Sequence, residues 1–233
     1  MSKILIKNNK GGVGKSWLTL QISSGLAQLG YKVLVVTSDS QNDILGFLGI
    51  DTPTKGGLEK WVNKGNGDLI RLRDNLFYIP LITNIFSKQF KEKLKEKLNE
   101  FNQKYDYVLI DAVPVMGIDK EFEEVADKII IPTFMDNVTC NGVEKMIDNI
   151  SDIRKIKAIV PNRFLGSKDE KIMLENLKNM LLTSNIFLSN PIKHKAIITK
   201  LNNKFKTIWE SKTKDINEIQ ETIGSVLEVI LDE

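Results

Sequence analysis

A short apolar segment, followed at once by a glycine-rich turn and an amphipathic stretch, constrains the fold of this chain more than any other feature. Residues 4–6 are Ile-Leu-Ile, three glycines lie between positions 11 and 14, and residues 16–29 repeat leucine and isoleucine at helical spacing up to Gly30. The first run is typical of a buried strand and the later spacing of a helix. The sequence therefore predicts a strand, a tight turn and a helix in succession.

The same alternation continues along the chain. Further strands are expected at 33–36, 107–111, 128–131 and 156–160, and helices at about 86–104, 139–154, 168–182 and 213–231. Strands that alternate with helices predict an α/β fold, in which helices cover both faces of a mainly parallel, twisted sheet. No Pro/Gly/Ser-rich linker divides the chain, so we expect a single domain over residues 1–233.

The glycine-rich turn matches a phosphate-binding pattern. Residues 9–16 read Asn-Lys-Gly-Gly-Val-Gly-Lys-Ser, which is the P-loop pattern with Asn9 in place of its first glycine. In a P-loop the backbone N–H groups surround phosphate oxygens, and the next helix presents its positive end to them. Lys15 would neutralise the β- and γ-phosphates, and the Ser16 hydroxyl would bind Mg²⁺. The expected phosphate-binding residues are Lys10, Gly11, Gly12, Val13, Gly14, Lys15, Ser16 and, through its backbone, Trp17.

Two aspartates follow predicted strands. Asp39 comes shortly after the strand at 33–36, and Asp111 ends the strand that begins at Tyr107. Because ligands of open parallel sheets bind at the carboxyl ends of the strands, both side chains are expected near the glycine turn. An aspartate often ends a strand without any function, but beside a P-loop Asp111 stands where the acid that holds Mg²⁺ through water is placed.

Composition excludes several classes of protein. The 233 residues are 42% hydrophobic and 27% charged, which is ordinary for a soluble globular chain. No apolar run approaches the roughly 20 residues that span a bilayer, and the N-terminus is not a signal peptide, so a cytoplasmic location is expected. Cys140 is the only cysteine in the sequence, and His194 is the only histidine. These counts exclude an intrachain disulfide and a cysteine- or histidine-rich metal site.

Charge is unevenly distributed, although the net charge is only +3. Residues 151–214 hold 14 Lys or Arg against five Asp or Glu, whereas residues 215–233 hold six acidic residues and no basic ones. A basic region of this kind is either a solvated surface or an electrostatic footprint for nucleic acid. The acidic C-terminal helix at 215–233 would be repelled by anionic lipid, so we expect it to pack onto the domain rather than to bind a membrane.

Several segments resemble one known family. The stretch KGGVGKS has a second lysine at Lys10, residues 34–43, 75–80, 105–117 and 126–132 are similar to further segments of the family in the same order, and Asn162-Arg163 follow a strand. These features resemble the deviant Walker A ATPases of the ParA/MinD family, most of all small plasmid-partition ParA proteins. The resemblance is specific to about residue 163. It implies a P-loop NTPase that binds ATP and Mg²⁺ and hydrolyses ATP.

The resemblance also implies roles for individual residues. Lys10 corresponds to the signature lysine, which reaches the partner's phosphates across an ATP-dependent homodimer. Asp39 corresponds to the acid that positions the attacking water, and Asn162, followed by Arg163, to the asparagine that reads adenine. The implied catalytic residues are Lys10, Lys15 and Asp39, and the implied metal ligands are Ser16, Asp39 and Asp111.

Three departures from the family pattern bear on hydrolysis. Thr37 stands in place of the first switch aspartate, and Trp17 replaces a threonine after the P-loop. Ala112-Val113-Pro114 replaces the usual Thr-Pro-Pro. Because Ser16 and Asp111 still provide for the metal, we expect ATP binding with slow turnover.

Partition-type members of the family bind DNA nonspecifically through basic residues in their C-terminal third. Such binding needs only phosphate neutralisation, so scattered lysines suffice. The candidates are Lys193, Lys195, Lys200, Lys204 and Lys206. This interpretation implies a nucleoid-associated dimer that works with a separate centromere-binding adaptor protein. One alternative is a positioning or adaptor ATPase that docks a protein cargo without DNA, and another is a switch that binds ATP without useful hydrolysis.

Overall fold

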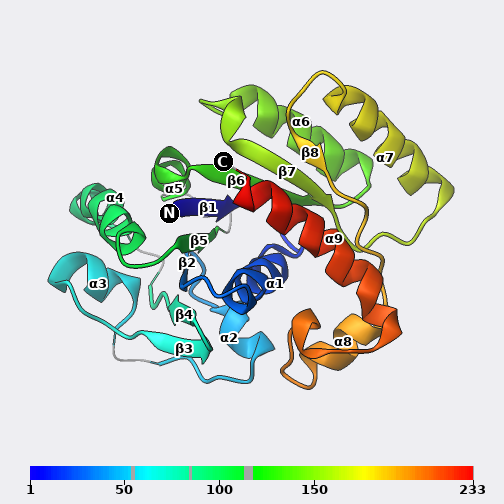
Figure 1. Ribbon diagram of the computed structural model, residues 1–233. Coiled ribbons are helices and arrows are strands. Elements are labelled where there is room, and N and C mark those ends of the chain that lie inside the picture. The colour runs from blue at the N-terminus through cyan, green and yellow to red at the C-terminus, as the bar shows by residue number, and fades with distance from the viewer. Residues whose placement is uncertain (54–55, 84–85, 113–117, 233) are drawn as a thin grey trace.

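A twisted eight-stranded sheet forms the centre of the computed structural model, which describes residues 1–53, 56–83, 86–112 and 118–232 (Figure 1). The strand order is β3-β4-β2-β5-β1-β6-β7-β8, and all neighbours are parallel except β3 and β4. The strands are β1 (Ser2–Ile6), β2 (Val33–Thr37), β3 (Ile70–Arg73), β4 (Leu76–Ile79), β5 (Tyr107–Asp111), β6 (Lys128–Thr133), β7 (Ile156–Pro161) and β8 (Phe187–Leu188). This mainly parallel sheet confirms the predicted α/β fold class.

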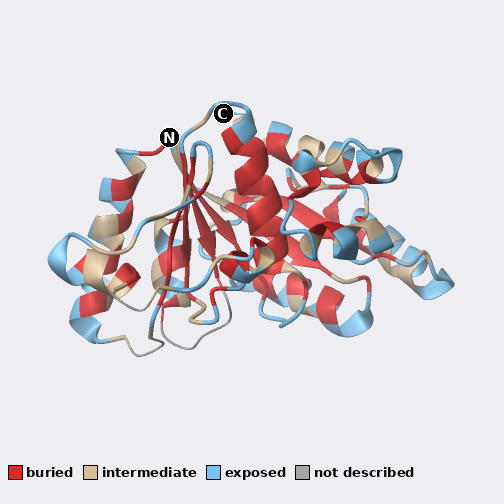
Figure 2. Ribbon diagram, turned by 90° about the horizontal axis from the view of Figure 1, so that it is seen from below, coloured by how far each residue is buried: buried red, intermediate tan, exposed pale blue. Residues whose placement is uncertain are grey.

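Helices cover both faces of the sheet. One face carries α1 (Lys15–Gln28), α2 (Asp43–Phe47), α8 (Ala196–Asn202), the 3-10 turn η2 (Ile208–Glu210) and α9 (Lys214–Leu231). The other carries α3 (Leu58–Lys64), α4 (Lys88–Asn102), α5 (Asp119–Val125), α6 (Asn137–Asn149) and α7 (Lys168–Leu181). Figure 2 shows the strands almost entirely buried between these two layers.

Alternate residues of each central strand enter different halves of the core. In β2, Leu34 and Val36 pack on the side of α3 to α7, whereas Val33 and Val35 pack on the side of α1 and α9. A strand that is buried on both faces has no polar face, which explains why the central strands read as continuous apolar runs in the sequence.

The acidic helix α9 packs onto the domain, as expected. Its apolar side chains Ile216, Ile219, Ile223, Val226 and Ile230 are buried against the face that carries α1. Among the described residues, no helix has the length and apolar character needed to cross a membrane.

Two expectations need correction or qualification. The helix expected over 139–154 is wrong at its C-terminal end, because α6 stops at Asn149. A separate 3-10 turn, η1 (Ile153–Lys155), follows, and the Asp152 side chain caps it by accepting the Arg154 N–H. The predicted segment 105–117 includes residues 113–117, which lie outside the described residues, so the departures at Val113 and Pro114 stay sequence observations.

Candidate nucleotide-binding site

The glycine turn follows β1 at the carboxyl edge of the sheet. β1 lies between β5 and β6, and ligands of such sheets bind at this edge. Gly12 and Gly14 have φ angles of 77° and 92°, which favour glycine, and Gly14 is the residue before α1. A Cβ atom on Gly14 would lie 2.3 Å from Nδ2 of Asn162. Position 14 therefore requires glycine for both its backbone conformation and its packing.

Asn162, at the end of β7, holds this turn in place. Its Nδ2 donates to the carbonyl oxygen of Val13 at 2.8 Å, and its Oδ1 accepts the Arg163 N–H at 2.9 Å. The structure thus gives Asn162 a contact with the P-loop that the sequence did not predict. Its adenine contact stays a prediction, because one amide N–H group is already used within the protein.

Lys15 is enclosed at the start of α1. It is only 5% exposed, and its Nζ donates to the carbonyl oxygen of Lys10 at 2.9 Å. Burial lowers the pKa of Lys15, and the negative charges of Asp111, Asp119 and Asp39 act in the opposite direction. The ammonium group of Lys15 is therefore held at the N-terminus of α1, where the negative charge of a phosphate would compensate for its burial.

Asp111 is the last residue of β5, and its side chain is 2% exposed. Burial raises the pKa of its carboxyl to about 7, while the Ser16 hydroxyl and Lys15 lower it. Its Oδ1 also lies 3.5 Å from the Thr19 hydroxyl. A buried carboxyl beside a serine hydroxyl fits a divalent cation, whose positive charge would favour the ionised form.

The described residues contain no group of three or more His, Cys, Asp and Glu side chains that could hold a metal ion by itself. A magnesium ion at Ser16 and Asp111 would therefore take its other ligands from phosphate and water. That is the usual pattern for this metal, which keeps several waters and binds one or two carboxylates together with substrate phosphates. The residues present thus fit Mg²⁺ bound with a nucleotide.

Thr37, which stands where the family has an aspartate, ties two strand ends together. Its hydroxyl donates to the carbonyl oxygen of Asp111 at 3.2 Å and accepts the Asp39 N–H at 2.9 Å. The Asp39 carboxylate in turn accepts the Gln41 N–H at 2.9 Å. The hydroxyl at position 37 therefore fixes the turn that carries Asp39 next to the strand that carries Asp111.

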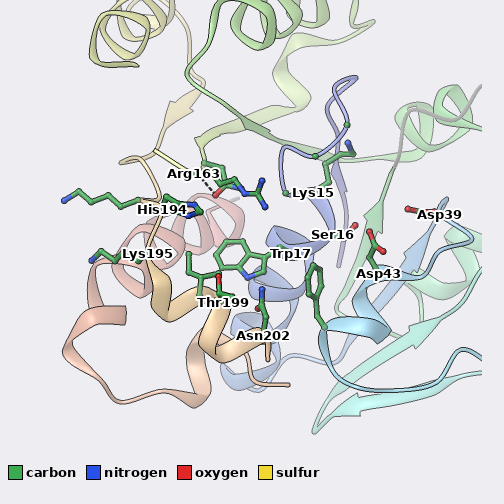
Figure 3. Close-up of a pocket in the computed structure, with 17 residues that line it drawn as sticks. Lys15, Ser16, Trp17, Asp39, Asp43, Arg163, His194, Lys195, Thr199 and Asn202 are labelled. Carbon is green, nitrogen blue, oxygen red and sulfur yellow. Dashed lines mark hydrogen bonds between the residues drawn. The ribbon is translucent and has the colours of Figure 1, made fainter. Parts of the chain in front are cut away.

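A pocket of about 550 Å³ runs from the glycine turn to α8 (Figure 3). Its first part, the phosphate end, is lined by Gly11, Gly12, Gly14, Lys15, Ser16 and Asp39. Its second part, the α8 end, is lined by Trp17, Lys193, His194, Lys195, Ile198, Thr199 and Asn202. Asp43 and Phe47 of α2 and the pair Asn162 and Arg163 complete the wall.

The pocket gathers most of the residues expected from the sequence. Of the residues expected to bind nucleotide or metal, Lys10, Val13 and Asp111 do not line it: Lys10 is exposed, whereas Val13 and Asp111 are buried. The sequence did not predict the contribution of α8, because its seven residues are too few for a clear helical period. The basic composition around Lys195 was the single signal that pointed to this segment.

The five lysines expected to bind DNA fall into two groups. Lys193 and Lys195 form ion pairs with Glu218 of α9 at 2.5 and 2.7 Å, and both line the pocket. The other three form no ion pair within the part of the chain that the structure describes, and all are exposed: Lys200, Lys204 and Lys206. We call these three the unpaired lysines.

Comparison with known proteins agrees with this geometry. The family model of the CobQ/CobB/MinD/ParA nucleotide-binding domain matches residues 4–208. The uncharacterized protein MJECL24 of Methanocaldococcus jannaschii is 30% identical over 214 residues, which are 77% of this chain and 80% of that protein. The chromosome-partitioning ATPase Soj of Thermus thermophilus is 24% identical over 158 residues, which are 65% of this chain and 62% of Soj.

Among solved structures, a complex of Cyanothece McdA with ATP has a TM-score of 0.83 at 19% identity, and the match covers 100% of this chain and 97% of McdA. At this identity the likeness shows the fold alone. The family match over most of the chain shows more. This chain belongs to the CobQ/CobB/MinD/ParA nucleotide-binding family, whose ParA and MinD members are P-loop ATPases.

Proposed function

We propose that this protein is a DNA-segregation ATPase that dimerises when it binds Mg·ATP, binds DNA nonspecifically as a dimer and hydrolyses ATP slowly. The observation that carries the proposal is the place of the unpaired lysines beside the nucleotide pocket. Lys200 lies on α8, the same short helix whose Thr199 and Asn202 line the pocket. Lys204 and Lys206 follow in the turn after α8. One segment thus joins the nucleotide to the basic surface.

The charge of this surface suits duplex DNA without base recognition. Nonspecific binding depends on lysines that neutralise phosphates, and each such contact adds about 0.9 to the salt dependence of the binding constant. A dimer would present two copies of the unpaired lysines to one duplex, so dimerisation would raise DNA affinity by avidity. ATP would then control DNA binding through the oligomeric state.

Residues in and next to the phosphate end would supply the chemistry. Lys15 would hold the phosphates, and Ser16 and Asp111 would hold Mg²⁺, which neutralises the charge that develops on them during transfer. Asp39 would position the attacking water. Lys10 is exposed and its side chain lies outside its own pocket, which suits a residue that contacts phosphates bound in a second copy of the chain.

The relative from Thermus thermophilus, Soj, is a chromosome-partitioning ATPase, which supports the same activity. Partition systems also need recognition of a particular DNA site. We propose that a separate centromere-binding adaptor protein provides it and stimulates hydrolysis, while this chain binds nucleoid DNA without sequence preference.

Binding to nonspecific duplex DNA with ATP, with ADP and without nucleotide tests the proposal. We expect binding with ATP alone, and a steep loss as salt is raised. Replacing the unpaired lysines together by glutamine should weaken binding at least about tenfold and flatten the salt dependence. The matched control replaces three exposed lysines on the opposite face of the sheet that also form no ion pair among the described residues, Lys145 of α6 and Lys168 and Lys171 of α7, and should bind like wild type. Failure of the ATP-loaded protein to bind DNA at low salt would overturn the proposal.

A second candidate is a positioning or adaptor ATPase that docks a protein cargo. A cleft of about 900 Å³ between α6, η1 and α7 favours it, because some of the apolar side chains that line it are exposed. Ile153 is 47% exposed and Met180 is 37% exposed. A dimer that forms with ATP but binds no DNA in any nucleotide state would favour this candidate.

A further inference from the structure

The turn after α8 contains a residue with a strained backbone. Phe205 has a φ angle of 56°, in the left-handed region that a bulky side chain rarely adopts. Its N–H donates to the carbonyl oxygen of Asn202 at 3.0 Å, and the N–H of Lys206 donates to that of Leu201 at 3.0 Å. These two bonds are those of a Schellman turn, whose left-handed residue is usually glycine. Phenylalanine therefore stands here at a conformational cost that glycine would avoid.

Contacts within the protein hold the Phe205 turn but cover only part of the ring. The ring lies against Gly49, because a Cβ atom added to Gly49 would be 2.9 Å from Cγ of Phe205. The Phe205 carbonyl oxygen accepts a hydrogen bond from Nη2 of Arg73 at 2.8 Å, which ties the turn to β3. Even so, Phe205 is 52% exposed. It is the one aromatic residue in the exposed class within the described part of the chain. Its packing therefore does not account for the ring at this position.

The exposed ring lies within the basic segment that carries the unpaired lysines. Lys204 and Lys206 are its neighbours in the chain, and Lys200 lies on α8 just before the turn (Figure 1). Lysines alone suit any polyanion, but an aromatic ring among them suits a ligand that has apolar surface between its anionic groups. Nucleic acid has this arrangement, because its sugars and bases lie between rows of phosphates. The chemistry of the segment thus fits DNA better than an anionic surface without apolar groups.

We propose that Phe205 contacts DNA directly, and that its ring meets sugars and bases in the minor groove while the unpaired lysines contact the phosphates beside it. This inference rests on the proposed function, which supplies DNA as the partner. Apolar side chains that enter the minor groove do not need a particular base, so the contact agrees with nonspecific binding. The fixed turn also suits the role, because a ring that is already held in place loses little conformational freedom on binding.

The salt dependence of DNA binding by the full chain separates the ring from the lysines. Phosphate contacts set the slope of the binding constant against salt concentration, whereas an apolar contact changes affinity equally at each salt concentration. Phe205→Gly removes the ring and suits the left-handed backbone, so the turn should keep its shape. With ATP and nonspecific duplex, this variant should bind about fivefold more weakly or less tightly still, with an unchanged slope. Phe205→Trp keeps an aromatic ring and should bind within about twofold of wild type.

Leu182→Gly is the matched control, because Leu182 is a 70% exposed apolar residue that follows α7 on the opposite face of the sheet. It should bind DNA like wild type. Equal affinity of Phe205→Gly and wild type would overturn the DNA contact and leave DNA segregation standing. A flatter slope in Phe205→Gly would also overturn it, because the ring would then only position the lysines. ATP-saturated wild type that binds no DNA would reject both DNA segregation and the contact.

Discussion

The phosphate end and the α8 end of the pocket are built in different ways. Apart from Asp39, the phosphate end consists of residues that lie close together in the sequence, between positions 11 and 16, and the backbone of the glycine turn shapes it. It is buried at Lys15 and Ser16. The α8 end joins Trp17 to residues between Lys193 and Asn202, far along the chain, and its Lys193 and Lys195 are held by ion pairs to Glu218. A site made of consecutive backbone is rigid and sensitive to change. A site made of distant side chains tolerates change but can vary in specificity.

The largest expected effect lies at the phosphate end. Lys15→Ala should lower Mg·ATP affinity on the order of a thousandfold, because the enclosed cation that meets the phosphates is lost and charge-assisted hydrogen bonds are the strong ones. Calorimetry measures it directly. Lys10→Ala is the control, since the Lys10 side chain lies outside the pocket of its own chain, and it should bind ATP normally while losing ATP-dependent dimerisation. If Lys15→Ala bound ATP within threefold of wild type, the phosphate end would be misassigned.

A second large effect concerns folding of the same turn. Gly14→Ala should lower the free energy of unfolding by about 3 kcal/mol, because φ is 92° and the new Cβ would lie 2.3 Å from the Asn162 amide. Urea unfolding measures the change. Gly142→Ala in α6 is the matched control: nothing lies within 4 Å of its added Cβ, so it should raise stability by up to about 1 kcal/mol. Similar losses for both variants would contradict the account of the turn.

Features that depend on neighbouring residues were predicted from the sequence, whereas features that depend on distant residues were not. The apolar runs at β1, β2, β5, β6 and β7 predicted the central strands, because burial on both faces leaves an unbroken signal. The glycines and Lys15 predicted the turn, since its conformation depends on residues next to each other. All these strands are confirmed.

The rest depended on contacts between distant residues. No local pattern places Trp17 and Asn202 in one pocket, or Gly14 against Asn162, so neither arrangement was predicted. The basic balance of residues 151–214 was evident, but the pairing of Lys193 and Lys195 with Glu218 needed the position of α9. Short elements such as α2 and α8 also escaped prediction, because five or seven residues show less than two helical turns.

The buried carboxyl of Asp111 makes the stability of the phosphate end depend on pH. Burial raises the pKa of Asp111 from 3.8 to about 7, so its stabilising contribution to the fold without nucleotide is complete below pH 3.8 and is lost as pH rises through about 7. Asp111→Asn should therefore gain stability on the order of 2 kcal/mol over wild type at pH 8 and little at pH 4. Thermal unfolding of both proteins across this range measures the difference.

The difference in stability between wild type and Asp111→Asn isolates the contribution of Asp111 from the contributions of other acids. Burial also raises the pKa of Asp119, to about 6. The pKa of Glu210 is lowered, because hydrogen bonds from Thr207 and Arg73 together outweigh the upward effect of burial. Both groups remain in Asp111→Asn, so their contributions cancel in the comparison. Parallel stability curves for the two proteins would show that Asp111 stays ionised when buried. The variant should also lose the stabilisation that Mg·ATP gives wild type, because the carboxylate is the expected metal ligand.

The smallest expected effect lies at the α8 end. Glu218→Gln removes the partner of Lys193 and Lys195, which are 52% and 28% exposed in their side chains, so stability should fall by less than about 1 kcal/mol. If the proposed DNA binding holds, affinity for nonspecific duplex with ATP should rise about threefold and its salt dependence should steepen, since two more lysines become available to phosphates. Glu228→Gln removes the same charge from an exposed position of α9 that has no ion pair among the described residues. A rise confined to Glu218→Gln would show that α9 sets the DNA affinity of this end by holding two lysines, whereas an equal rise in both variants would reduce the effect to net charge.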